Sequence, residues 1–345
     1  MGATTKRNEM VLMCTSLTYE NSRGDHFLAR TMDFDIDFGA RIMVMPRNRV
    51  VAGDAGDYTT QYGFVGAGRL LDHEMYTDGV NECGVGIATL YFPGNVYYYD
   101  DTPADKLGIA PQDFVAWALG NAASVDDLAN KVEQIALINK AANFIGAVPP
   151  LHFIISDTTG KTMLLEPQGG ELALIDDPVG VMTNSPDLAW QLQNLSTYGT
   201  LTNQERPLTP LMGQPLATQG PGTGALGLPG DFTSPSRFVR TTFLKNYAAE
   251  TTTIPDALNM IQHILNSVTI PKGVKLKANG QSDYTEYRGY MSLDERAYYM
   301  EPYDNQVLQR VALTDDLLDH LAEPREYPIH HQVYVQDLTP DTVSD

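Results

Sequence analysis

The order of the expected elements limits the fold of this 345-residue chain more than any other feature of its sequence. Stretches with strand-like and helix-like spacing come in blocks, as strands, helices, strands, helices and strands. The expected strands are 14–21, 26–34, 41–46, 78–92 (opening with turn residues), the hairpin 151–167, 287–293, 297–302 and 305–313; the expected helices are 111–121, 124–137, 236–248 and 255–268. Because a doubly wound sheet needs regular βαβ alternation, this order favours an α+β fold.

The chain shows no clear linker and no internal repeat, so we expect one domain over residues 14–325. Residues 1–13 lack the apolar run of a secretory signal, and we interpret them as a propeptide or a mis-set translation start. Residues 203–235 are rich in Pro, Gly, Thr and Gln and predict a long ordered loop. Residues 326–345 are expected to form a peripheral tail.

The formal net charge of −20 argues against several kinds of partner. Nucleic-acid binding needs clustered Lys and Arg, and an anionic membrane surface also disfavours an acidic chain. No run of eighteen apolar residues is present, so we expect no membrane span. The two cysteines form neither a disulfide framework nor a C-x-x-C motif, which fits a reducing, cytoplasmic environment.

Cys14 stands directly after Met13, and this position allows two interpretations. An internal cysteine is usually a small buried hydrophobe. If Met13 and the residues before it are absent, Cys14 carries a thiol and a free α-amine, whose pKa of about 7.7–8.0 leaves part of it as a base near neutral pH. Nucleophile and base would then come from one residue, with no histidine required. We therefore take Cys14 as the candidate nucleophile.

Other sequence patterns for hydrolytic or cofactor chemistry are weak. The seven histidines show no strong zinc-binding spacing, and G-x-S-x-G is absent. A Ser-His-Asp triad and an unrelated thiol hydrolase with a histidine base both stay open. GTGALG at 222–227 matches G-x-G-x-x-G, but it follows a loop and opens no helix, which argues against dinucleotide binding. We expect no metal and no cofactor.

Four polar residues in apolar or small-residue surroundings are candidates to act with Cys14. Arg30 and Asp33 lie three residues apart in the stretch LARTMDF, where an Arg would lower the pKa of a nearby thiol and an Asp could hold a terminal amine. Asn184 and Arg237 stand in GVMTNSPD and DFTSPSRF. Each also has a plainer interpretation, as part of a surface ion pair, a turn or a helix cap.

Several separated motifs carry a resemblance to a known family. They are MCTSLT, LARTMDF and PRN, then DGVNECGVGIATLYFPG, GVMTNSPD and GTGALGLPGDFTSPSRFVR. In this order, from Met13 to about residue 313, they resemble the choloylglycine hydrolase family, which includes conjugated bile salt hydrolases and penicillin V acylases. The resemblance implies an N-terminal nucleophile (Ntn) hydrolase. Its fold would be an α+β, four-layer αββα sandwich with two antiparallel sheets, commonly a homotetramer, and it would cleave a linear non-peptide amide C–N bond without metal or cofactor.

The resemblance also implies a role for each candidate residue. Cys14 would be the nucleophile, Arg30 would sit beside the thiol, Asp33 would hold the α-amine, Asn184 and the backbone N–H of Tyr91 would form the oxyanion hole, and Arg237 would order the site. Family members usually begin at or a few residues before the Met-Cys pair, and the residues upstream of Met13 depart from that pattern.

The specificity that the resemblance favours is that of a penicillin V acylase, which removes a phenoxyacetyl side chain from 6-aminopenicillanic acid. Bile salt hydrolases typically carry Asn at the position of Tyr91, and an aromatic wall suits a phenoxyacetyl ring. The alternative is a conjugated bile salt hydrolase that releases glycine or taurine, and another N-acyl amide, such as an acyl homoserine lactone, also stays open. An alternative of another class is a non-catalytic small-molecule binding protein on the same fold.

Overall fold

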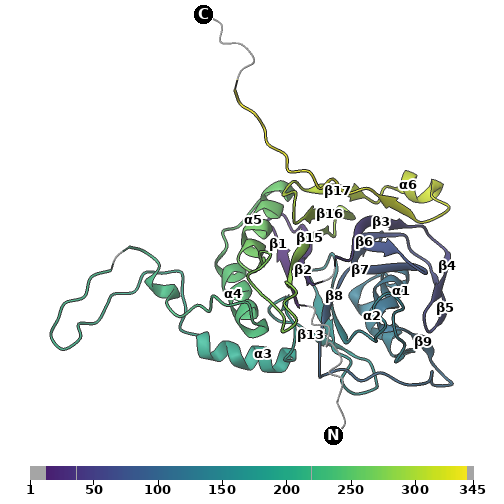
Figure 1. Cartoon of the computed structure of the whole chain (residues 1–345), viewed down its shortest axis with the longest axis horizontal. Helices are drawn as coiled ribbons and strands as arrows, with labels where there is room; N and C mark the ends of the chain where they lie inside the picture. The colour runs from purple at the N-terminus through teal and green to yellow at the C-terminus, as the bar shows by residue number, and fades with distance from the viewer. Residues whose placement is uncertain (1–12, 36, 219, 340–345) are drawn as a thin grey trace, which may run out of the picture.

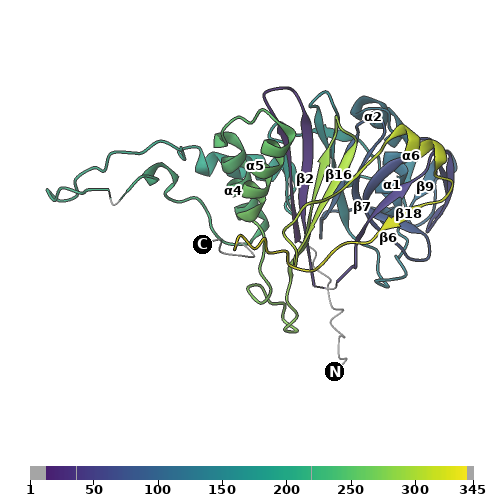
Figure 2. The same ribbon diagram turned by 90° about the horizontal axis from the view of Figure 1, so that it is seen from above.

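Two antiparallel β-sheets packed face to face form the centre of the molecule, with helices on the outer side of each (Figures 1 and 2). The computed structural model describes residues 13–35, 37–218 and 220–339. The layers run helix, sheet, sheet, helix when the molecule is seen from above (Figure 2). This arrangement confirms the α+β class expected from the order of the elements and the αββα sandwich that the resemblance implied.

The first sheet has six strands in the order β14-β1-β2-β15-β16-β17. Their bounds are β1 (Met13–Glu20), β2 (His26–Phe34), β14 (Val181–Met182), β15 (Tyr284–Ser292), β16 (Ala297–Pro302) and β17 (Gln309–Ala312). β1 and β2 form a hairpin along their whole length, and β15 pairs with the other side of β2. The first and last thirds of the described chain therefore meet in one sheet.

The second sheet has eight strands in the order β13-β12-β11-β8-β7-β6-β3-β18. Their bounds are β3 (Arg41–Met45), β6 (Phe64–Leu70), β7 (Glu74–Asn81), β8 (Gly86–Tyr91), β11 (Leu151–Ser156), β12 (Thr162–Leu165), β13 (Leu174–Asp176) and β18 (Arg325–Tyr327). Two small ribbons flank it: β4 (Arg49–Gly53) with β5 (Gly56–Thr60), and β9 (Leu107–Ile109) with β10 (Ile135–Leu137).

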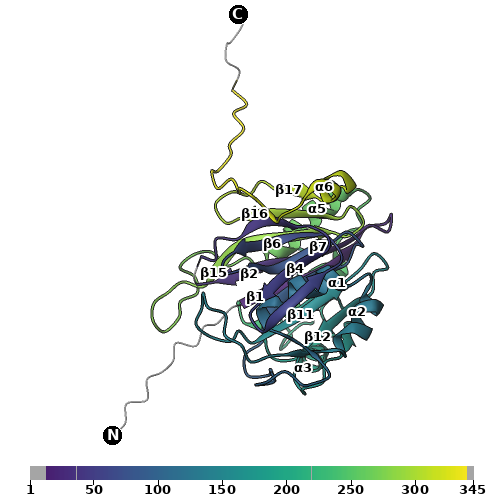
Figure 3. The same ribbon diagram turned by 90° about the vertical axis from the view of Figure 1, so that its right-hand side faces the viewer.

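Helices cover the outer faces of the sandwich (Figures 1 and 3). The α-helices are α1 (Phe114–Asn121), α2 (Val125–Val132), α3 (Leu188–Leu195), α4 (Ser234–Tyr247), α5 (Ile254–Asn266) and α6 (Asp315–His320); the short 3-10 helices are η1 (Pro111–Asp113), η2 (Ser196–Tyr198) and η3 (Thr223–Ala225). α4 and α5 contact β1, and α1 contacts β7 and β8. Ser124 and Thr253 cap α2 and α5 by accepting a backbone N–H in the first turn.

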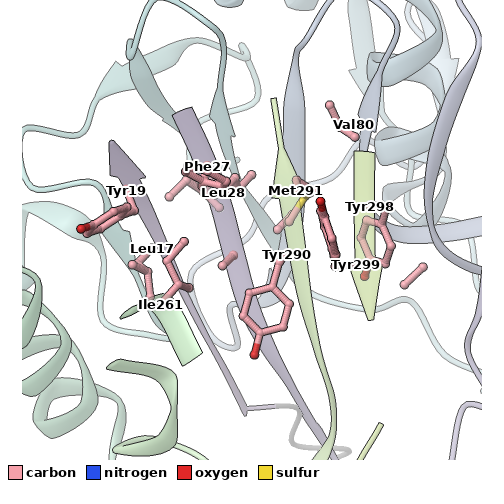
Figure 4. Packing of buried hydrophobic residues seen from close by; sticks show 14 of the residues in the cluster. Leu17, Tyr19, Phe27, Leu28, Val80, Ile261, Tyr290, Met291, Tyr298 and Tyr299 are labelled. Atoms are coloured by element: carbon pink, nitrogen blue, oxygen red, sulfur yellow. The ribbon is translucent and has the colours of Figure 1, made fainter. Parts of the chain in front are cut away.

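The central strands are buried on both faces, which explains their continuous apolar sequences. In β2, Phe27 and Leu28 point to opposite faces and neither is exposed. Figure 4 shows this packing: Leu17 and Ile261 belong to the cluster that joins β1 to α5, and Tyr290 and Met291 continue it on β15. A second cluster fills the space between the second sheet and α1 and α2.

Two expected elements differ from the structure. Residues 78–81, which read as a turn, are the end of β7, and the chain turns only at residues 82–85 before β8. The helix expected over 124–137 ends at Val132, and residues 135–137 form β10 beside β9. Cys83, which falls within the strand expected over 78–92, therefore lies half-buried in a turn.

The segment between α3 and α4 projects from the body as a long arm with little regular structure (Figures 1 and 2). It exposes the apolar side chains of Leu211, Met212 and Leu226. GTGALG lies in this arm, around η3. At the other end of the chain, β18 pairs with β3, and His330 then hydrogen-bonds to Asn305 and to Gln309 of β17 before the last described residues extend from the body (Figure 1). None of the helices in the described residues has the length and apolar character needed to cross a membrane.

Candidate active site

A largely apolar cavity opens beside the N-terminal end of β1. Its volume is about 680 Å³, counting the solvent-filled mouth. Cys14 and Arg30 contribute polar atoms to its lining, whereas most of the wall is apolar. The apolar wall includes Met32, Phe34, Phe38, Met75, Tyr91 and Phe144. A lining of this kind is typical of a site for an apolar small molecule.

The β1–β2 hairpin places Arg30 against the thiol of Cys14. In its register Cys14 pairs with Met32 and Ser16 with Arg30, so Cys14 and Arg30 lie on the same face, two positions apart. Arg30 Nη2 donates to Cys14 Sγ at 2.8 Å. Both side chains are buried, at 1% exposed for Cys14 and 0% for Arg30. Arg30 therefore lies directly beside the Cys14 thiol.

Asp78, which was not among the residues selected from the sequence, completes this arrangement. Arg30 Nη1 donates to Asp78 Oδ2 at 3.1 Å, with neither side chain exposed. Burial opposes a charge on Arg30, but Cys14, Tyr287 and Asp78 hold its pKa above the usual value. The signal for Asp78 in the sequence is an acidic residue at the start of the mostly apolar stretch 78–92. The first residues of that stretch also resemble a turn.

The Cys14 thiol lies between opposing electrostatic influences. Burial raises its pKa, Arg30 lowers it, and Asp33 raises it again. The net effect is a pKa above the ordinary value. With Met13 still bonded to Cys14, as in the structure, the thiol is therefore protonated at neutral pH. A base is needed to make it a nucleophile.

Asp33 is fully buried next to the start of β1. It pairs in register with Met13, and its carboxylate accepts hydrogen bonds from Thr285 Oγ1 at 2.6 Å and Thr31 Oγ1 at 3.1 Å. Burial raises the pKa of Asp33 to about 6, against the opposing effect of Arg237. Asp33 therefore lies opposite Met13, the residue bonded to Cys14.

Asn184 and Arg237 hold the backbone of Cys14. Asn184 Oδ1 accepts from the Cys14 N–H at 2.9 Å and from Arg237 Nη2 at 2.7 Å. Because two donors fix the oxygen, the amide nitrogen must face the other way, and Nδ2 donates to the Tyr91 carbonyl at 2.7 Å. Arg237 Nη1 also donates to the Cys14 carbonyl and to Thr15 Oγ1.

The six residues selected from the sequence therefore come together, although they lie in five separate parts of the fold. Cys14 is on β1, Arg30 and Asp33 on β2, Tyr91 at the end of β8, Asn184 just after β14, and Arg237 on α4. β14 pairs with β1, which brings Asn184 back to the strand that carries Cys14. Arg237 is fully buried, and burial lowers its pKa below the usual value.

No histidine is found among the described residues that line the cavity, so a histidine base for Cys14 has no candidate there. His152 is the buried histidine of β11, and its Nε2 lies 2.8 Å from the Thr183 carbonyl. Its ring stacks on Phe92, with 4.3 Å between centroids. These contacts give His152 a structural role.

One group of side chains has the composition of a metal site. Within the described part of the chain, Asp54, His73 and Asp113 each bring a possible ligand atom within 4.8 Å of the others. However, His73 Nε2 lies 2.6 Å from Asp113 Oδ1, and the Asp54 N–H donates to Asp113 Oδ2 at 2.8 Å. The protein's own donors thus engage both carboxylate oxygens of Asp113, and the group needs no ion to satisfy it.

Comparisons with known proteins point to one family. The family model for linear amide C–N hydrolases of the choloylglycine hydrolase family matches residues 14–325. A bile salt hydrolase/transferase from Clostridium perfringens is 34% identical over 312 residues, which is 89% of this chain and 94% of that protein. A penicillin V acylase from Pectobacterium atrosepticum is 28% identical over 57% of this chain and 55% of that protein. The crystal structure of a mutant of the conjugated bile acid hydrolase from Clostridium perfringens superposes with a TM-score of 0.88, at 31% identity, over 95% of this chain and 100% of that one.

Proposed function

The chain belongs to the choloylglycine hydrolase family of linear amide C–N hydrolases, and on that basis we propose that it cleaves conjugated bile salts with Cys14 as nucleophile. The observation that carries the proposal is the placement of the Cys14 thiol, held by Arg30, at an apolar cavity. An apolar wall of this kind suits the steroid part of a bile salt, and the amide bond would then lie at the sulfur.

We propose bile salts as the substrates in place of penicillin V, the substrate that the sequence motifs favoured. The relative named as a bile salt hydrolase/transferase is more similar to this chain, and over far more of its length, than the one named as a penicillin V acylase. Tyr91 lines the cavity and supports penicillin V as a second substrate. Five of the apolar groups around it, Met32, Phe34, Phe38, Met75 and Phe144, suit a steroid as well as a phenoxy ring.

We propose that catalysis requires Cys14 to be the first residue. The α-amine would take the thiol proton, the thiolate would attack the amide carbon, and a thioester would form as the protonated amine product leaves. Water would then attack the thioester and release the acid. Asn184 Oδ1, which lies 2.9 Å from Cys14 N, would orient the amine together with Asp33.

The same proposal gives the oxyanion two donors. Asn184 Nδ2 uses one N–H on the Tyr91 carbonyl, and its second N–H would bind the oxyanion. The backbone N–H of Tyr91 is the other proposed donor, on the basis of the family resemblance. Arg237 would keep Asn184 in this orientation through its bond to Oδ1.

The decisive experiment compares the chain beginning at Cys14 with its Cys14→Ala variant. We expect the first to hydrolyse glyco- and tauro-conjugated bile salts faster than penicillin V, and the second to be inactive while still binding the bile salt. Mass spectrometry must confirm the N-terminus. If a chain that begins at Cys14 binds bile salts and cleaves no amide, the protein is a binding protein and the proposal is wrong. If it cleaves penicillin V much faster, the alternative specificity holds.

We also propose a homotetramer located in the cytoplasm. The family resemblance supports the tetramer, and the projecting arm with exposed Leu211, Met212 and Leu226 offers apolar surface for subunit contacts. Cys14 and Cys83 are both free thiols, in keeping with a reducing compartment. Light scattering of the purified chain would measure the mass; a monomer at micromolar concentration would contradict the tetramer.

A further inference from the structure

The Arg30 guanidinium lies between the nucleophile and a carboxylate from the opposite sheet. Its Nη2 donates to Cys14 Sγ at 2.8 Å, and its Nη1 donates to Asp78 Oδ2 at 3.1 Å. Asp78 is on β7 in the second sheet, whereas Cys14 and Arg30 are on the first. The ion pair therefore crosses the interior between the sheets, where neither side chain reaches solvent.

Two β-bulges bring the groups around Asp78 together. In β7 the extra residue is Thr77, directly before Asp78; in β15 it is Glu286, directly before Tyr287. A bulge changes the direction of the side chains beside it. The Tyr287 hydroxyl donates to Asp78 Oδ2 at 2.9 Å, and the Thr77 hydroxyl lies 2.7 Å from the Tyr287 oxygen.

The strand opposite Arg30 also leaves room for this cluster. Gly289 pairs with Arg30 in register. A Cβ at that position would collide with the Tyr298 hydroxyl and would lie 3.4 Å from Asp78 Oδ1. A glycine at 289 therefore allows the Tyr298 ring to lie against Asp78. Four strands thus contribute to the surroundings of one carboxylate.

We propose that Asp78 is a positioning residue for the reaction, which fixes Arg30 against the Cys14 thiol and offsets part of its positive charge. The guanidinium is a planar fork, so the Nη1 bond to Asp78, together with the Nε bond to the Thr31 carbonyl, determines where Nη2 points. The carboxylate also weakens the attraction of the guanidinium for a thiolate. Asp78 therefore sets both the direction and the strength of the influence of Arg30 on sulfur.

Other charged or titratable groups face the same sulfur and must be kept constant. They are Asp33 on β2 and Arg237 on α4, which act on the thiol directly, and Tyr287 and Tyr298, which act through Arg30. In a chain that begins at Cys14, the α-amine is a further one. A variant confined to Asp78 leaves all of these in place.

The test is Asp78→Asn in a chain that begins at Cys14, since Asn keeps the shape and an acceptor but removes the charge. We expect the thiol pKa of Cys14 to fall by about one unit, because the guanidinium acts on sulfur uncompensated. We also expect kcat to fall about 10-fold or more, with KM within about twofold, because Nη2 is no longer held in place. The thiol pKa is read from the pH dependence of alkylation by iodoacetamide, with the Cys14 and Cys83 peptides separated by mass spectrometry.

Asp177→Asn is the matched control, because Asp177 is also a buried aspartate, at 6% exposed, and lies outside this cavity. It should leave the thiol pKa and kcat unchanged. If Asp78→Asn folds and its thiol pKa and kcat equal those of the parent, Asp78 belongs to a purely structural ion pair and the proposal is wrong.

Tyr287→Phe covers the case in which Asp78→Asn does not fold. It removes one donor to Asp78 and keeps every charge, and we expect kcat to fall about threefold while the chain stays folded. An unchanged kcat in Tyr287→Phe would overturn the proposal. The kinetic results depend on the proposed function, whereas the alkylation results do not. If the parent chain cleaves neither bile salt nor penicillin V, but Asp78→Asn still lowers the thiol pKa of Cys14, only the proposed function is refuted.

Discussion

Two cavities lie along β1 and differ in character. The first, with Cys14, is lined mainly by apolar side chains. The second lies near the other end of the strand, where residues 18–20 meet Asp177 and Lys245, and its lining is mainly polar. β1 therefore borders both cavities, and of these two only the first combines a candidate nucleophile with an apolar wall.

The difference shows that unusual acidity alone does not identify a reactive site. Burial raises the pKa of Asp177 to about 6 and lowers that of Lys245 to about 8, so both depart strongly from their ordinary values. Burial raises the pKa of Asp33 to about 6 as well. What distinguishes Asp33 is its place beside the backbone of Met13 and Cys14, and not its acidity.

The largest expected effect is a loss of activity on changing Asn184, which bonds to Cys14 beside the first cavity. Asn184→Ala removes the side chain that binds the Cys14 N–H and is proposed to bind the oxyanion. We expect kcat to fall about 10²- to 10³-fold, the usual loss of one oxyanion donor. Steady-state kinetics with a glyco-conjugated bile salt measures it. A loss confined to KM would mean that Asn184 binds substrate and does not stabilise the transition state.

The second prediction compares Asp33 with Asp177 by pH. Both have a folded-state pKa of about 6, above the ordinary value of 3.8, so the folded chain binds these protons more tightly than the unfolded chain. Each therefore contributes stability that is complete below about pH 4 and is lost as the pH rises through 6, at most about 3 kcal/mol per group. Urea unfolding measured between pH 4 and 7 should show that the free energy of unfolding falls less with rising pH in Asp33→Asn and in Asp177→Asn than in the parent chain.

Asp33 and Asp177 should no longer behave alike in a chain that begins at Cys14. A free α-ammonium lowers the pKa of a nearby carboxylate. The loss of stability with rising pH that Asp33 causes should therefore shrink in the trimmed chain, while the loss that Asp177 causes persists. Equal contributions from the two aspartates before and after trimming would show that the α-amine does not reach Asp33.

Lys245→Met tests the second cavity with a smaller expected effect. Lys245 Nζ donates to the Val179 carbonyl at 2.7 Å and to Thr18 Oγ1 at 3.0 Å, and Met leaves both without that donor. We expect the free energy of unfolding to fall by about 1–3 kcal/mol, with kcat/KM unchanged. Denaturant unfolding and kinetics on the same preparation check both. Reduced kcat/KM in a fully folded variant would link the two cavities.

The smallest effect is expected at the wall of the first cavity. Tyr91→Asn removes an aromatic ring from the lining while the backbone that accepts from Asn184 stays. We expect the ratio of kcat/KM for bile salt over penicillin V to rise about 3- to 10-fold, within the range of one apolar contact. An unchanged ratio would mean that Tyr91 does not contribute to selectivity.

Two charged residues of the site could be predicted from the sequence because they stand in an apolar strand. Arg30 and Asp33 interrupt a run that is otherwise suited to a core, and a buried charge requires a partner. Asp78 was missed because Asp-Gly-Val-Asn resembles a turn. Its place in a strand depends on pairing with β6, which a local pattern cannot show.

The fold class followed from the blocks of strands and helices, whereas the short edge strands did not. β14 has two residues and exists through its pairing with β1, and β18 likewise depends on β3. The end of α2 was misjudged because Ile135 continues the helical spacing of Leu128 and Val132. In the structure residues 135–137 pair with β9 instead. In each case the conformation of the segment depends on a strand that is distant in sequence, which a local pattern does not show.

The ion pair between Arg30 and Asp78 has a consequence for the newly made chain. One partner belongs to each sheet, so the environment of Cys14 is complete only after the two sheets have docked. A nascent polypeptide with separate halves therefore carries an ordinary sulfhydryl. The bonds that hold Arg30 between Asp78 and the Cys14 sulfur form only with tertiary assembly. The rate of Cys14 labelling during refolding would record that moment directly.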